Sequence, residues 1–208
     1  IAEALHPYPT ELVIGTKGGL VRPSRHRWDK DGRPEHLRRA LDGSLKRLRL
    51  DRIDLYQFHS PDPKVPFADS VGPLAELQRA GKIRHLGVSN VTVRQLDEAR
   101  RIATIVSVQN EYNIENRSDD AVLAACTKAG IAFIPWYPLG AGRALRSAKV
   151  KRVAARMGAT PAQVAIAWLL ARSPVMLPIP GTSTMAHLEE NAAAAALRLA
   201  PEDLAALG

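Results

Sequence analysis

Regular alternation of strand-like and helix-like segments is the feature that most constrains the fold of this chain. Short runs rich in apolar residues recur along it, and each is followed by a segment whose apolar residues repeat at helical spacing. Alternation of this kind requires parallel strands joined by right-handed helical crossovers, so we expect an α/β protein. Six strands are predicted in this way, over residues 12–16, 53–58, 83–88, 105–108, 131–135 and 174–179.

The predicted helices have recognisable start and stop signals. Pro34 suits the first turn of a helix that continues through Leu50, and Thr160 followed by Pro161 is a capping residue with proline at the first helical position. Thr92 and Thr184 (or Ser183) are further expected N-caps, and residues 17–33 are expected to form a long polar loop. The remaining helices are expected over 1–6, 69–80, 93–99, 118–128, 150–157 and 201–207.

Two architectures fit this alternation, a closed (β/α)8 barrel of the TIM type and an open doubly wound sheet. No Gly-x-Gly-x-x-Gly follows any strand, which removes the main signal for a dinucleotide-binding open sheet. The predicted strands end instead in polar or aromatic residues, as the strands of a barrel do at its functional end. These residues are Lys17, His59, Ser89 with Asn90, Gln109 with Asn110, and Trp136. We therefore predict a single barrel domain over residues 1–208, with about six β/α units present.

Composition and charge exclude several classes of function. The net charge of +8 is basic, but the positive residues are mixed with Asp and Glu, and no recognised nucleic-acid-binding module accompanies the dense basic segment 22–33. Cys126 is the only cysteine and the histidines do not fall at ligand spacings, so we expect neither a disulfide nor a metal site. No apolar run reaches the roughly 18 residues that a membrane span requires. No signal peptide is recognised at the start, so we expect a cytoplasmic protein without nucleic-acid or membrane partners.

Six motifs in a fixed order carry a resemblance to the aldo-keto reductases, which are nicotinamide-dependent (β/α)8 barrels that reduce aldehydes and ketones. The resemblance covers essentially the whole chain, from the family's third barrel strand onward. The motifs are Thr16-Lys17-Gly18, Leu55 to Asp62, Gly87-Val88-Ser89-Asn90, Gln109 to Asn113, Trp136-Tyr137-Pro138-Leu139-Gly140, and Ile179 to Thr182 continuing through His187 to Asn191.

The resemblance implies a catalytic role for two residues. Lys17 matches the lysine of the family's Asp-Tyr-Lys-His tetrad, whose charge lowers the pKa of the tyrosine that protonates the carbonyl oxygen. His59 matches the tetrad histidine, which orients and polarises that carbonyl. The implied substrate is therefore a small carbonyl compound; the sequence does not indicate which one, nor whether the protein is a monomer or a homo-oligomer.

The resemblance also implies how a nicotinamide cofactor is bound. Ser89, Asn90 and Gln109 match the residues that hold the nicotinamide carboxamide, Trp136 with Tyr137 falls where an aromatic ring stacks on it, and Leu139 and Gly140 lie where backbone approaches the pyrophosphate. The adenosine end matches Gly181, Thr182, Ser183, His187, Glu190 and Asn191. Gly181 and His187 stand where relatives often have a lysine and an arginine for the 2′-phosphate, and a histidine is a weaker, pH-dependent phosphate partner than arginine. The resemblance to the family still makes NADPH the expected cofactor, with NADH as the alternative.

The family's aspartate and tyrosine precede the matched region, and we expect no substitute among these residues. Tyr8 precedes its strand, Tyr56 lies inside one, and Tyr112 has no reason to lie beside Lys17. Two functional hypotheses follow: an NADPH-dependent oxidoreductase for carbonyl reduction, and a non-catalytic nicotinamide-binding regulator similar to the potassium-channel beta subunits. Cofactor binding with turnover indicates the oxidoreductase, and cofactor binding without turnover indicates the regulator.

Overall fold

The computed structural model describes residues 1–208, and the chain divides into two compact units, Ile1–Val108 and Gln109–Gly208. Unit 1 contains a parallel sheet in the order β1-β4-β5-β6, formed by β1 (Gly15–Gly18), β4 (Ile53–Phe58), β5 (Ile83–Ser89) and β6 (Ile105–Gln109). The last residue of β6 begins unit 2. The expectation of parallel strands is confirmed in this unit, whereas the single domain over 1–208 stays a prediction.

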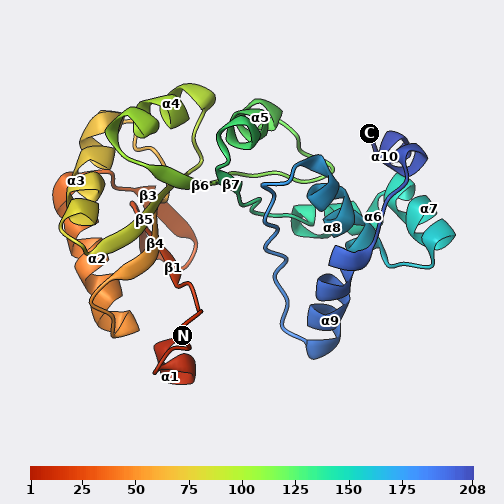
Figure 1. Ribbon diagram of the computed structural model, residues 1–208, viewed down its shortest axis with the longest axis horizontal. Coiled ribbons are helices and arrows are strands. Elements are labelled where there is room, and N and C mark those ends of the chain that lie inside the picture. The colour runs from red at the N-terminus through yellow and green to blue at the C-terminus, as the bar shows by residue number, and fades with distance from the viewer. The chain divides into compact units, whose positions relative to one another are not determined.

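Three helices of unit 1 cover one face of its sheet (Figure 1). They are α2 (Pro34–Leu48), α3 (Phe67–Arg79) and α4 (Val93–Ile102), and a short helix, α1 (Ala2–Leu5), precedes the sheet. Proline opens α2 as expected, and Thr92 caps α4 through a reciprocal pair of bonds with Gln95. Leu37, Leu41, Val71 and Leu74 are fully buried on the inner faces of α2 and α3, which explains why their sequences repeat leucine and valine at helical spacing.

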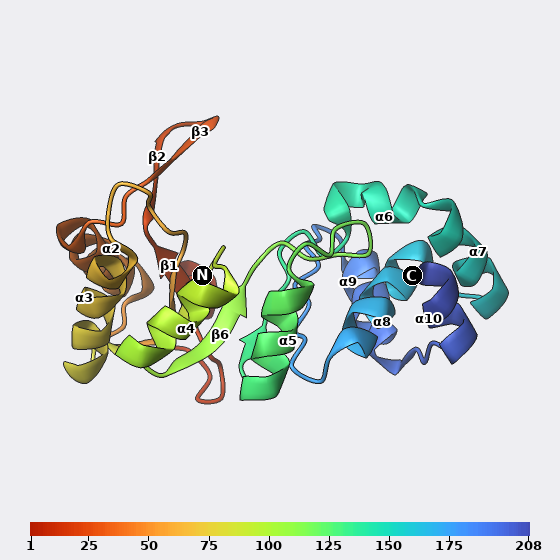
Figure 2. The same cartoon turned by 90° about the horizontal axis from the view of Figure 1, so that it is seen from above.

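Residues 17–33, expected to form a loop, contain an antiparallel hairpin instead. Its strands are β2 (Leu20–Ser24) and β3 (Arg27–Lys30), and it projects from the body of unit 1 (Figure 2). The hairpin is mostly exposed and polar, so it lacks the alternating apolar pattern from which a strand is recognised. The basic segment 22–33 therefore has a defined conformation.

Unit 2 is mainly helical. Its elements are α5 (Asp120–Ala129), the short strand β7 (Ala132–Phe133), the 3-10 turn η1 (Gly140–Gly142), α6 (Arg143–Arg146), α7 (Ala148–Met157), α8 (Pro161–Arg172), α9 (Met185–Ala193), η2 (Ala194–Ala196) and α10 (Pro201–Leu207). Its core contains Tyr112, whose ring stacks on Trp168 at 6.0 Å and meets Phe133 edge-on at 5.7 Å. Burial raises the pKa of Tyr112 to about 12, and its hydroxyl donates to Asp120.

The sixth predicted strand, residues 174–179, is not a strand. Only Met176 pairs, in a parallel bridge with Phe133, whose N–H donates to Val175 O while Leu177 N–H donates to Phe133 O, both at 2.8 Å. Pro174, Pro178 and Pro180 have no backbone N–H, so the segment cannot extend this pairing in either direction.

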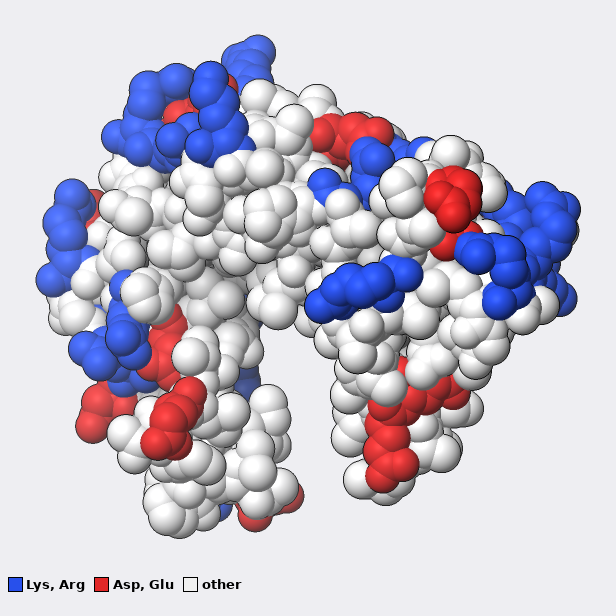
Figure 3. Space-filling model, turned by 45° about the vertical axis from the view of Figure 1, so that its right-hand side comes forward, with Lys and Arg blue, Asp and Glu red and all other residues white.

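Charged side chains are distributed over the surface of both units. In Figure 3, Lys and Arg form separate patches with Asp and Glu beside several of them. No single helix is both long and apolar enough to cross a membrane; α7 and α8 satisfy the length and composition criteria only as a pair, and this pair is bent by 97°.

Candidate functional site

The parallel sheet of unit 1 has one polar face, opposite the face that the helices cover. Lys17, Gln57 and Gly87 are in register on neighbouring strands and therefore share that face. The Gln57 side chain donates to Ser107 Oγ at 3.1 Å, which places β6 in the same polar row. The alternate residues Tyr56 and Phe58 point to the helix side, where the Phe58 ring lies 6.0 Å from Phe67 of α3.

Lys17 and His59 lie at the carboxyl end of this polar face. Lys17 is the third residue of β1, and His59 follows β4 directly, with its N–H donating to Gly18 O at 2.8 Å. Burial lowers the pKa of Lys17, and burial together with the positive charge of Lys17 lowers the pKa of His59 to about 4. His59 is therefore a neutral imidazole near pH 7, able to donate a hydrogen bond without carrying a charge.

Ser89 and Asn90 lie at the carboxyl end of the neighbouring strand β5, beside His59. Ser89 is the last residue of β5, and Asn90 follows in a left-handed conformation with φ of 58°. The Asn90 side-chain amide donates to the carbonyl oxygen of His59 at 2.9 Å and to Ser89 Oγ at 3.1 Å. The structure thus brings together Lys17, His59, Ser89 and Asn90, each of which is predicted from its position at the end of a strand.

Neither tyrosine of unit 1 belongs to this group. The Tyr8 hydroxyl donates to Leu48 O at 2.8 Å, at the end of α2. The Tyr56 hydroxyl is buried on the helix side without a hydrogen-bond partner, and burial raises its pKa. Both hydroxyls therefore lie away from the polar face that carries Lys17.

In unit 2, the loop that carries Trp136, Tyr137 and Gly140 is held by two asparagines. Trp136 N–H donates to Asn110 O at 3.0 Å, and the fully buried Asn113 donates from its amide to Tyr137 O at 3.1 Å. Tyr137 has a φ of 52° although it is not glycine, and its ring meets the Trp136 ring edge-on at 4.9 Å. Such strain in a loop is found mainly where the surrounding structure holds it for a function.

Four residues predicted for the adenosine end of a cofactor, together with Leu139 predicted for its pyrophosphate, line one pocket of about 200 Å³ in unit 2. Three of them project from α9, a helix capped by Thr184, whose Oγ1 accepts from His187 N–H at 3.3 Å. Thr182 and Ser183 lie in the preceding loop and do not line the pocket. The five residues are Leu139, Gly181, His187, Glu190 and Asn191.

Glu190 is fixed in this pocket by a residue that the sequence analysis had identified only as a helix cap. The Thr160 hydroxyl donates to the Glu190 carboxylate, and it also accepts from Gln163 N–H at 3.2 Å to cap α8. Asn113 likewise belongs to the motif Gln109 to Asn113, but the sequence predicts no individual role for it. Both residues act through partners distant in sequence, which no local pattern reveals.

Gln109 ends β6 and is 7% exposed, and it continues the row of strand-end polar residues. It is also the first residue of unit 2. Its expected contact with the nicotinamide carboxamide stays a prediction, as do the individual roles of the other site residues.

Comparison with known proteins gives a consistent result. The sequence profile of the aldo/keto reductase family matches residues 1–208. The chain is 46% identical over 208 residues to an uncharacterized oxidoreductase of Schizosaccharomyces pombe, covering all of this chain and 68% of that protein. It is 46% identical over 218 residues to pyridoxine 4-dehydrogenase of Escherichia coli, covering all of this chain and 74% of the relative.

A solved structure agrees with these relatives. An aldo-keto reductase of Klebsiella pneumoniae in complex with NADPH superposes with a TM-score of 0.82 and 27% identity, over 99% of this chain and 72% of that one. The parallel sheet and its helices match the α/β fold of these (β/α)8 barrel proteins. The chain spans about two thirds to three quarters of the length of the proteins that it matches.

Proposed function

The chain belongs to the aldo/keto reductase family, and from this premise we propose that the protein is an oxidoreductase that reduces aldehydes or ketones to alcohols with a nicotinamide cofactor. The observation that carries the proposal is the pairing of Lys17 with a neutral His59 at the ends of adjacent parallel strands. A carbonyl oxygen that accepts a hydrogen bond from a neutral imidazole beside an ammonium group gains electrophilic stabilisation as negative charge develops on it.

In this proposal the two residues have distinct roles. His59 orients the carbonyl and donates a hydrogen bond to its oxygen, which its low pKa allows without protonation of the ring. Lys17 supplies a fixed positive charge, partly removed from water by burial, that favours the ionised form of a nearby proton donor. Ser89 and Asn90 complete the polar end of the sheet and position the amide of the nicotinamide.

The residues of unit 2 fit the adenosine part of such a cofactor. The pocket on α9 offers an imidazole, a carboxylate held by Thr160 and a carboxamide, which suit the hydrogen-bonding edge of adenine and its ribose. NADPH is the proposed cofactor, with NADH as the alternative; it supplies the hydride when bound. The named complex of the Klebsiella pneumoniae relative with NADPH supports this choice.

The same observations allow a second function, a nicotinamide-binding regulator that does not turn over. Fluorescence titration with NADPH, run beside a turnover assay, separates the two. Saturable binding without oxidation of NADPH in the presence of aldehydes indicates the regulator, and the absence of binding rejects both functions.

The enzyme proposal is tested by following NADPH absorbance with a panel of aldehydes that includes pyridoxal, chosen because one relative is named for pyridoxine oxidation. We expect His59→Ala to lower kcat by about 10²–10³-fold, the usual effect of removing one donor to a developing oxyanion. Lys17→Met is expected to lower it comparably.

His85→Gln provides the matched control, because His85 lies on the same polar face but near the amino end of β5. This variant is expected to retain activity within a few-fold. Equal activity of His59→Ala and wild type would contradict the proposed role of His59. No turnover with any aldehyde would contradict the enzyme proposal.

A further inference from the structure

A second pocket of unit 1 opens at the same end of the sheet as Lys17 and His59. One wall comes from the hairpin β2–β3, which follows Lys17, and the other from residues 62–65, which follow His59. Its volume of about 730 Å³ lies within the range of small-molecule sites, roughly 300–1,000 Å³. No predicted site residue lines this pocket, and it shares no residue with the group around His59.

The charges that line this pocket do not cancel. Its three carboxylates are all engaged within the protein: Asp29 with Arg27 at 2.8 Å, Asp31 with Arg33 at 2.7 Å, and Asp62 with the backbone N–H groups of Gly32 and Lys64, both at 3.0 Å. Lys30 and Lys64 also line the pocket; neither forms an ion pair within 4.0 Å, although the charge of Lys64 acts on Asp62 and helps to lower the pKa of that carboxyl. Four cations thus face three carboxylates, and Lys30 is the ammonium group left without a carboxylate partner.

An exposed aromatic ring lies beside these lysines. Trp28 also lines the pocket, and it is 56% exposed although it is among the largest apolar side chains of the chain. The Arg22 guanidinium lies over its ring, 4.9 Å from the centroid, and donates to Arg25 O instead of to a carboxylate. The hairpin thus contributes an indole ring to the lining of the pocket, with the Arg22 guanidinium held against that ring.

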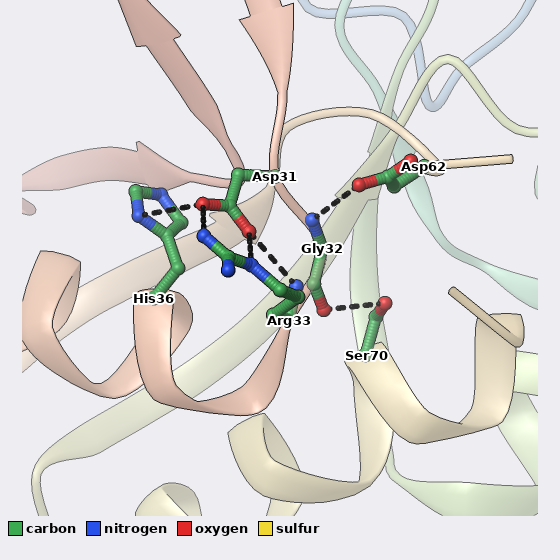
Figure 4. Close-up of polar contacts among 6 residues, drawn as sticks. All are labelled: Asp31, Gly32, Arg33, His36, Asp62 and Ser70. Atoms are coloured by element: carbon green, nitrogen blue, oxygen red, sulfur yellow. Dashed lines mark hydrogen bonds and ion pairs between the residues drawn. The ribbon is translucent and has the colours of Figure 1, made fainter. Parts of the chain in front are cut away.

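The two walls are tied together by a buried polar network (Figure 4). Asp62 accepts from Gly32 N–H, and the Ser70 hydroxyl donates to Gly32 O at 2.8 Å, so residues after β3 are joined to the loop after β4 and to α3. The Asp31 carboxylate accepts hydrogen bonds from the Arg33 guanidinium and backbone N–H. These bonds, together with the nearby His36, lower the pKa of Asp31 to about 2. A site held in this way loses little entropy when a ligand binds.

We propose that this pocket binds the anionic aromatic part of the substrate, so that the protein acts on aryl or heteroaryl carbonyl compounds that carry a carboxylate or a phosphate. The ring stacks against Trp28, and the anionic group is held by Lys30 and Lys64. The substrate class rests on the proposed carbonyl reduction, whereas the pocket itself is tested without turnover.

Binding is measured with unreactive probes, benzoate and phenyl phosphate, against benzyl alcohol as the neutral counterpart. We expect saturable quenching of tryptophan fluorescence by the two anions, lost in Trp28→Leu and weakened by salt. The double variant Lys30→Gln/Lys64→Gln is expected to weaken anion binding by about tenfold. Lys151→Gln, an exposed lysine of unit 2, is the matched control. Equal affinity for benzyl alcohol, or anion binding unchanged in the double variant, overturns the proposal.

Kinetics then test the substrate class. The ratio of kcat/KM for 4-carboxybenzaldehyde, or for 4-formylphenyl phosphate, to that for benzaldehyde should exceed one and should fall about tenfold in the double variant. Glyoxylate is an anion without an aromatic ring, so its kcat/KM reports the contribution of charge without that of stacking on Trp28. Reduction of benzaldehyde without a lysine-dependent preference for the anions rejects this substrate class and leaves carbonyl reduction standing. Lysine-dependent anion binding without any reduction rejects the proposed enzyme and keeps the pocket.

Discussion

The close approach of Gly18 to Tyr56 shows how tightly single residues are constrained beside the site. A Cβ on Gly18 would lie 2.1 Å from the Tyr56 hydroxyl oxygen, which is buried and has no hydrogen-bond partner. The hydroxyl therefore contributes no bond to stability, yet it fixes the residue next to Lys17 as glycine. Removing a buried unpaired polar group is nearly neutral or stabilising.

This contact predicts a non-additive pair of substitutions. Gly18→Ala should destabilise the protein by about 1–3 kcal/mol through overpacking, and Tyr56→Phe alone should change stability by less than about 1 kcal/mol. The double variant should recover part of the loss, because it removes the 2.1 Å contact with the hydroxyl oxygen, while the ring carbon Cζ at 3.0 Å from the new methyl group still has to move by a few tenths of an ångström. Urea unfolding measures all three. Additive losses would show that the hydroxyl is not the obstacle.

Single residues also show what sequence can predict about a site. Lys17, His59 and Asn90 were identified because each follows or ends a recognisable strand, and strand ends of a parallel sheet converge. Asn113 and Thr160 were not identified as site residues, because their roles depend on partners 24 and 30 residues away. The pKa of His59 could not be predicted either, since it depends on burial and on the placement of Lys17.

At the scale of elements, α8 and α9 are joined through Thr160 and Gln163. Thr160 caps α8 and its hydroxyl also donates to the Glu190 carboxylate of α9, while the Gln163 side-chain amide donates to Glu190 O at 3.4 Å, so the start of α8 also shapes the pocket. The sequence Thr-Pro-Ala-Gln predicts the cap alone.

Thr160→Val is therefore expected to act twice. Loss of the cap should cost about 0.5–2 kcal/mol of stability, and loss of the bond to Glu190 should weaken NADPH binding severalfold. Thr160→Ser keeps the hydroxyl and is the matched control for both effects. Thr92→Ala removes a similar cap from α4 and should reduce stability without the same loss of affinity. Thermal unfolding and fluorescence titration provide the readouts, and NADPH affinity unchanged in Thr160→Val would contradict the coupling.

Central strands and well-capped helices were predicted most closely. The strands 53–58, 83–88 and 105–108 were expected within one residue of β4, β5 and β6, and the helices 150–157 and 201–207 within two residues of α7 and α10, because charged residues, caps, proline and glycine mark those ends locally. The first strand was expected over 12–16, whereas β1 is Gly15–Gly18, since its extent is set by pairing with β4. Val13 is apolar yet 63% exposed. Pairing is a long-range property, and apolar runs alone do not define it.

At the scale of the whole molecule, acid stability should depend on His59. Its pKa of about 4 in the folded protein is below the ordinary value of about 6.5, so the unfolded chain binds the proton more tightly between these values. Stability is therefore full above pH 6.5, declines as the pH falls toward 4, and loses no more from this group below that.

The expected loss from His59 is of the order of 1–2 kcal/mol, allowing for its partial contact with solvent. Urea unfolding of wild type and His59→Gln at pH 7 and at pH 4.5 measures it. The variant should lose less stability than wild type over this interval, whatever its stability at pH 7, and His85→Gln should behave as wild type does. Parallel losses in His59→Gln and wild type would show that His59 titrates normally.

Successive side chains of β4 alternate between two environments. Tyr56 and Phe58 face the helices, while Gln57 and His59 face the polar side. We expect substitutions at the first pair to act on packing against the helices and substitutions at the second pair to act on the polar face that carries Lys17. A library randomised at every second position of this strand can therefore vary the polar face while the side that packs against the helices stays unchanged.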